Sequence, residues 1–194
     1  MNSHCKLSLV TKTYLDTFFN ILNNMIQKMT NVALTNSISD IFIRQMIPHH
    51  AAAIEMSNNI LRYTTNLELQ DIALNIVAEQ TKSIANMQAI QQQCGSVTNS
   101  EYERSHYMNS FRSISETMFH EMGTACITNG VNANFLREMI PHHMGAVRMS
   151  NNVLQFNICP QLKPILYAII SSQCEGIKQM QQLLIQLECV GAER

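Results

Sequence analysis

Two short segments of the sequence place adjacent histidines between methionines. Residues 46–56 are MIPHHAAAIEM, and residues 139–149 are MIPHHMGAVRM. On a helix, Met46 lies one turn before His50, so a thioether and an imidazole can approach one ion, and the second segment repeats this spacing. Neutral sulfur and nitrogen donors suit soft ions such as Cu(I) and Ag(I) better than Mg²⁺ or Ca²⁺. Both segments therefore predict a soft-metal site.

The predicted ligands come from both segments. The last methionine of each segment lies two turns beyond the first histidine and would need a partner helix to join a site. The predicted metal ligands are His49, His50, Met46, Met56, His142, His143, Met139 and Met149. Four downstream residues are expected to support them, namely Gln80, Gln173, Met87 and Met180. A buried glutamine could bond one ring nitrogen and leave the other free for a metal.

An alternative without metal stays open. The same histidines and glutamines could form a buried hydrogen-bond network that fixes the register of the helices, aided by carbonyls that the prolines free. An enzyme is less well supported, because the Glu-x-x-His motif of di-iron bundles occurs only once, at residues 103–106 within the predicted linker, and the sequence has no glycine-rich phosphate loop. An oxidoreductase would rest on fold analogy alone. We expect a binding or structural protein rather than an enzyme.

The two segments belong to a longer internal match at a constant offset of 93 residues, which aligns Tyr14 with Tyr107, for example. Self-similarity at one fixed period indicates internal repeats. We place the repeats at residues 14–93 and 107–186. The linker is predicted at residues 94–106, where glycine, serine and charged residues show no period.

Each repeat predicts three amphipathic helices, because apolar residues recur at every third or fourth position. The predicted helices span residues 14–36, 39–63, 67–93, 107–128, 132–156 and 162–189. Pro48 should kink the second helix or restart it. Strand patterns are absent from the sequence. The result is an all-α antiparallel bundle, with a four-helix core from the second and third helices of each repeat and the first helices as covers.

Composition favours one domain over residues 1–194. The chain is 46% hydrophobic, enough for one shared core. It has 13 basic and 14 acidic residues, a net charge of -1, and scattered basic residues, which argues against nucleic acid and anionic membranes as partners. No segment reaches the roughly 18 apolar residues of a membrane span, and the first residues lack the apolar core of a signal peptide. We expect a cytoplasmic protein whose partner is a metal ion.

The sulfur-containing residues are numerous. The six cysteines show no Cys-x-x-Cys spacing and do not align across the offset; they are Cys5, Cys94, Cys126, Cys159, Cys174 and Cys189. We therefore expect reduced thiols that pack as small apolar side chains, and neither a disulfide framework nor a zinc cluster. The chain has 13 methionines and no tryptophan. Of these, Met25, Met29, Met118 and Met122 are predicted to lie in the core.

The pattern resembles a known family. Asp40-x-Phe42, the MIPHH segment, Gln80, Ile84 and Met87 resemble the DUF305 family of bacterial ferritin-like proteins, and the second copy fits over residues 135–180. The resemblance implies a ferritin-like four-helix bundle with the histidine pairs as the functional centre. Some members are secreted or periplasmic copper-binding proteins, which implies copper buffering or resistance with Cu(I) as the ion. This chain has Ser83 and Gly176 where the family often has glutamate.

Overall fold

The structure is a computed structural model that describes residues 6–192, and within that range it contains six α-helices and no strand. The helices are α1 (Leu9–Thr30), α2 (Ile38–Ile60), α3 (Leu67–Cys94), α4 (Glu101–Gly123), α5 (Val131–Val153) and α6 (Leu162–Ala192). The predicted all-α class is confirmed. None of the described helices has a stretch long and apolar enough to span a bilayer.

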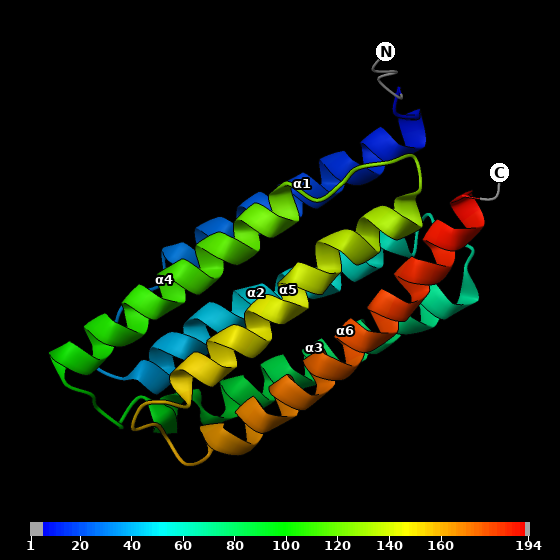
Figure 1. Cartoon of the computed structure of the whole chain (residues 1–194). Coiled ribbons are helices and arrows are strands. Elements are labelled where there is room, and N and C mark those ends of the chain that lie inside the picture. Colours follow the sequence, from blue (N-terminus) through cyan, green and yellow to red (C-terminus); the bar gives the residue numbers. More distant parts are fainter. Residues whose placement is uncertain (1–5, 193–194) are drawn as a thin grey trace.

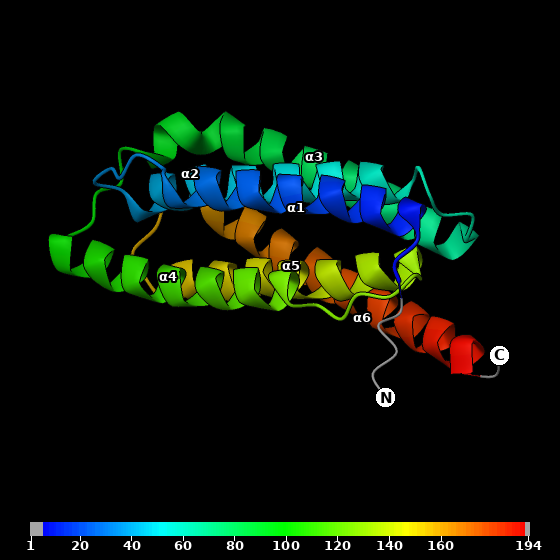
Figure 2. The same cartoon turned by 90° about the horizontal axis from the view of Figure 1, so that it is seen from above.

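The helices form three layers of two (Figures 1 and 2). The pair α2 and α5 lies in the middle, with α1 and α4 on one side and α3 and α6 on the other. The start of α1 and the end of α6 lie at the same end of the bundle. The predicted arrangement is therefore confirmed, since α2, α3, α5 and α6 form a four-helix core that α1 and α4 cover.

Side-chain caps set the starts of four helices. Ser8, Ser37, Asn66 and Ser100 each accept a hydrogen bond from the backbone N–H three residues later. At Ser100 the Glu103 side chain reaches back to the cap, which completes a capping box. The predicted linker at residues 94–106 is therefore too long, because the capping box starts α4 at Glu101. The charged residues of this first helical turn had suggested a loop.

The two middle helices are not interrupted at their prolines. Both α2 and α5 are continuous helices, with Pro48 and Pro141 inside them, so of the two outcomes predicted at Pro48, a kink or a restart, the restart is excluded. The bounds of α5 follow those of α2 at the same 93-residue offset that the sequence shows. The derivation of the chain from two tandem copies stays a prediction.

Two tyrosines tie the covering helices to the middle layer. The Tyr14 hydroxyl of α1 donates to Glu138 Oε2 of α5 at 2.6 Å, and the Tyr107 hydroxyl of α4 donates to Gln45 Oε1 of α2 at 2.7 Å. Each covering helix therefore bonds the middle helix of the opposite half. Burial raises the pKa of Glu138 to about 8, with the Tyr14 hydrogen bond acting against that rise.

A disulfide joins Cys94, at the end of α3, to Cys159, in the connection between α5 and α6. The start of α2 positions both residues, because Ser37 Oγ donates to the Cys94 carbonyl at 2.8 Å and the Cys159 N–H donates to Ser39 Oγ at 2.9 Å. Their Cα atoms are 5.1 Å apart, a separation that suits a disulfide. The expectation of six reduced cysteines is therefore wrong for this pair.

The remaining described cysteines are free. Cys126 and Cys189 are exposed, and Cys174 is partly buried. Cys5 lies outside the described residues. Spacing could not reveal the disulfide because it joins positions 65 residues apart that meet only through the packing of helix ends.

We predict that reducing the disulfide, or replacing Cys94 and Cys159 with serine, lowers the free energy of unfolding by about 4 kcal/mol, because the crosslink closes a loop of 65 residues. Urea unfolding measures this loss, and thiol titration of the unfolded chain should find two more thiols after reduction than before. As a control, serine at Cys126 and Cys189 should leave stability nearly unchanged. Equal thiol counts would contradict the disulfide.

Glu138→Gln tests the buried carboxyl, since glutamine is the residue at the matching position Gln45. The wild-type carboxyl stays protonated in the folded state at pH values where it ionises in the unfolded chain. Its contribution to stability is therefore fully present below pH 4.5 and is lost as the pH rises towards about 8. We expect the stability of the wild type relative to Glu138→Gln to fall by up to about 1.4 kcal/mol per pH unit over this window.

Urea unfolding of both proteins across pH 4 to 9 measures the difference and cancels the titration of groups common to both. Glu116→Gln, which makes the same substitution on the exposed face of α4, is the control. A constant difference between wild type and Glu138→Gln would contradict the buried, protonated carboxyl.

Candidate metal centre

The four histidines of the two segments meet in the middle layer of the bundle. His49 of α2 and His142 of α5 are completely buried, and their rings stack with centroids 3.7 Å apart. His50 and His143 are also buried, and each ring centroid lies 5.9 Å from that of the adjacent histidine. The structure thus brings all four predicted imidazoles together at the interface of the two halves.

The hydrogen bonds leave several ring nitrogens without protein partners. His142 Nε2 lies 3.2 Å from the His49 carbonyl, which can only accept, so Nε2 carries the proton. The lone pair of His142 is then on Nδ1, which is buried and has no partner. Neither ring nitrogen of His49 has a partner either. Unpaired buried nitrogens are costly, and a bound cation would compensate for that cost.

The outer two histidines face α3 and α6. His50 Nε2 lies 3.0 Å from Ser83 Oγ of α3, while its Nδ1 has no partner. His143 lies against Gly176 of α6, where a Cβ atom would come within 3.3 Å of Nε2. Ser83 and Gly176 were noted in the sequence only as departures from the family pattern. Their contacts with the histidine rings were not predicted, because they depend on how α3 and α6 pack.

Burial keeps the imidazoles uncharged. It lowers the pKa of His50 to about 3, with further lowering from His142 and His143, and it lowers the pKa of His143 to about 4. The pKa values of His49 and His142 also lie well below the usual range, first because of burial and then because of neighbouring histidines. All four rings are neutral at pH 7, which is the form that binds metal.

The methionines of the two segments are buried with the histidines. Their exposed fraction is 1% or less; they are Met46, Met56, Met139 and Met149. Met87 of α3 and Met180 of α6 are fully buried as well. The prediction that Met25, Met29, Met118 and Met122 lie in the core is confirmed. Met118 lies so close to Gly145, three residues after His142, that a Cβ atom there would overlap its sulfur.

The predicted bonds between glutamine and histidine are wrong. Gln80 and Gln173 are buried, but both amide atoms of Gln80 and Oε1 of Gln173 have no protein partner. Ser83, one turn after Gln80 on α3, takes the place beside His50 that a glutamine was expected to occupy. Both glutamines instead line hollows between α3 and α6. The structure therefore lacks the glutamine contacts of the alternative network.

The sequence of residues 40–184 matches the family described as "Domain of unknown function (DUF305)". The chain belongs to the DUF305 family. CopM in its Cu(I)-bound form is 27% identical, with a TM-score of 0.58 over 80% of this chain and 99% of CopM. A DUF305 fragment from Deinococcus radiodurans is 23% identical, with a TM-score of 0.57 over 79% of this chain and 99% of the fragment, and supports the fold.

CopM has also been solved with silver. The Ag-bound form obtained by soaking is 27% identical to this DUF305 chain, with a TM-score of 0.57 over 78% of this chain and 98% of CopM. No curated protein sequence matches the chain.

The donors of this DUF305 chain fit some metals and not others. Within residues 6–192, no three or more side chains of His, Cys, Asp or Glu lie close enough together to hold an ion. A zinc or di-iron centre would need such a group. An imidazole lone pair lies in the plane of its ring, so the rings of His49 and His142, which stack face to face, would have to turn to bind one ion between them. The donors fit a soft ion held by one or two imidazoles with thioethers.

The variant Gln80→Leu tests whether the Gln80 amide takes part in a hydrogen-bond network or is unpaired, as it is in the structure. Because Gln80 has no protein partner, we predict that metal-free Gln80→Leu keeps the stability of the wild type or gains up to about 1 kcal/mol. The matched control is Gln45→Leu, which leaves the buried Tyr107 hydroxyl without its acceptor and should cost about 1 to 3 kcal/mol. Urea unfolding measures both, and equal losses would support the network.

Proposed function

We propose that this protein binds Cu(I), or Ag(I) by the same chemistry, as cargo and thereby buffers the metal. The proposed ligands in the first half are His49, His50, Met46 and Met56. In the second half they are His142, His143, Met139 and Met149. Met87 and Met180 support them from α3 and α6. The observation that carries this proposal is the meeting of four buried, uncharged imidazoles with unpaired ring nitrogens, on two helices that also bury four methionines.

The charge of the site favours a monovalent soft ion. Imidazole and thioether donors are neutral, so a bound Cu(I) keeps a single positive charge in the low-dielectric interior. A divalent ion would place twice that charge there without a carboxylate to balance it. CopM, a protein of similar fold, has been solved with Cu(I), Cu(II) and silver, which supports copper or silver as the metal, while the choice of the monovalent ion rests on the charge of the site.

The structure also bears on the metal-free alternative and on location. A network that fixes register would pair its polar atoms, whereas both amide atoms of Gln80 and both ring nitrogens of His49 are unpaired.

The cytoplasmic location expected from the sequence stays a prediction. The Cys94–Cys159 bond favours an oxidising compartment, because cytoplasmic reductants keep most cysteine pairs reduced.

We predict that replacing the two methionines that precede the histidine pairs weakens Cu(I) binding. Met46→Leu with Met139→Leu removes two sulfur donors but nearly conserves volume, so the fold should survive. We expect at least a tenfold loss of affinity, about 1.4 kcal/mol, in competition with a coloured Cu(I) chelator. The matched control, Met29→Leu with Met122→Leu, changes two other buried methionines and should bind as the wild type does.

The titration needs a background in which thiols cannot compete for Cu(I). Serine therefore replaces the four cysteines outside the disulfide, and ascorbate keeps the copper reduced. His50→Gln with His143→Gln should weaken binding further than the methionine pair, while the exposed His120→Gln should have no effect. Wild-type affinity in the histidine double variant, with its helical content intact, would overturn the proposed function.

A further inference from the structure

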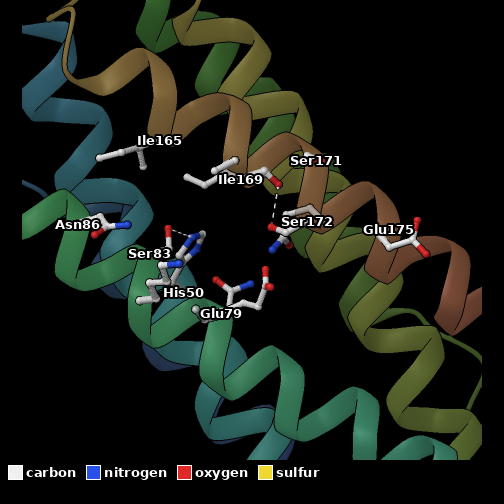
Figure 3. A pocket seen from close by; sticks show the side chains of 13 residues that line it. His50, Glu79, Ser83, Asn86, Ile165, Ile169, Ser171, Ser172 and Glu175 are labelled. Carbon is white, nitrogen blue, oxygen red and sulfur yellow. Dashed lines mark hydrogen bonds between the residues drawn. The ribbon is translucent and has the colours of Figure 1, made fainter.

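Two hollows lie between α3 and α6, beside the outer histidines, and Figure 3 shows the one lined by His50. One has a volume of about 420 Å³ and is lined by His50; the other has about 280 Å³ and is lined by His143. They share residues on their walls, including Glu79, Gln80 and Ser172, so we treat them as one feature, the α3–α6 groove. The groove gives each outer histidine a path to solvent.

Unpaired polar atoms line this groove. Gln80 from α3 is 1% exposed and Gln173 from α6 is 3% exposed, and both line each hollow. Neither carboxamide oxygen has a protein hydrogen-bond partner. Buried amides are normally paired. Two unpaired oxygens from opposite walls are suited to replace water around a passing cation.

The outer part of the groove carries negative charge. Glu79 and Glu175 line both hollows and are exposed, and in Figure 3 they lie on α3 and α6 respectively. Glu175 pairs with Lys178 at 3.6 Å, whereas Glu79 makes no ion pair with any described residue. Lys82 lines one hollow only. An unpaired carboxylate at the mouth of a groove raises the local concentration of cations.

The inner histidines line neither hollow. His49 and His142 have no exposed surface and stack on each other. Cations arriving through the α3–α6 groove would meet His50 and His143 first. Ser172 stands on the α6 wall of both hollows and is small, so it leaves the groove open.

We propose that the α3–α6 groove is the entrance for the metal. Glu79 attracts the cation, the carboxamide oxygens of Gln80 and Gln173 take over from its water ligands, and His50 or His143 receives it. This inference rests on the proposed function, because it assigns a route to the same histidines. It adds a distinct claim: the residues that line the groove outside the histidines affect the rate of metal loading more than the metal affinity.

Stopped-flow transfer of Cu(I) from its bicinchoninate complex measures loading, with serine at the four cysteines outside the disulfide. Ser172→Leu narrows both hollows, and we expect it to slow loading about tenfold while the equilibrium affinity changes less than about threefold. The matched control is Thr81→Leu, on the exposed face of α3, which also removes a hydroxyl bonded within its helix. This control should load as the wild type does.

Glu79→Gln tests the charge without filling the groove and is a surface change that the fold should tolerate. We expect loading to slow about threefold at low salt and the difference to vanish at high salt, because ions screen the attraction. Glu116→Gln, on the exposed face of α4, is the control and should have no effect.

A second measurement does not depend on metal. Diethylpyrocarbonate modifies neutral imidazoles, so mass spectrometry should find His50 and His143 modified before His49 and His142, and more slowly in Ser172→Leu. Loading and modification at wild-type rates in Ser172→Leu, with Cu(I) affinity intact, would overturn the entrance alone. Failure of the wild type to bind Cu(I) at all would overturn the proposed function and the entrance together.

Discussion

The contact between His49 and His142 constrains the rest of the molecule. Two imidazoles whose centroids lie 3.7 Å apart, both fully buried, cannot carry charge together. They also require α2 and α5 to approach closely at this point. The bond from His142 Nε2 to the His49 carbonyl then fixes one ring against the opposite backbone. The middle layer is thus built around polar groups that must stay neutral.

The outer layers support this middle layer in different ways. The covering helices α1 and α4 bond across it through Tyr14 and Tyr107, which ties the two halves together. The helices α3 and α6 instead leave hollows beside the outer histidines. Support and access are therefore on opposite sides of the bundle. A site closed on both sides would hold its histidines equally well but exchange ions only by unfolding locally.

Much of the fold could be predicted from the sequence, because the apolar period predicts the helices and the paired MIPHH segments indicate that the two halves are alike. The six helices and the inward histidines follow from local periodicity, and the layers follow from pairing the helices of the two repeats. The errors share another cause. The start of α4, the Cys94–Cys159 bond and the partner of His50 depend on a cap or on contacts between helix ends and faces, which have no period. Ser83 took the position assigned to Gln80 because one helical turn decides which side chain reaches the ring.

The disulfide and the choice of ligands are chemically connected. A thiolate is a stronger ligand for Cu(I) than a thioether or an imidazole, so free cysteines compete with a histidine and methionine site. Pairing Cys94 with Cys159 removes two buried thiols from that competition. Thioethers form no disulfides, so conditions that keep this bond oxidised leave the methionine donors able to bind. A protein that holds soft metal where cysteines are oxidised would need the donors that this bundle buries at its centre.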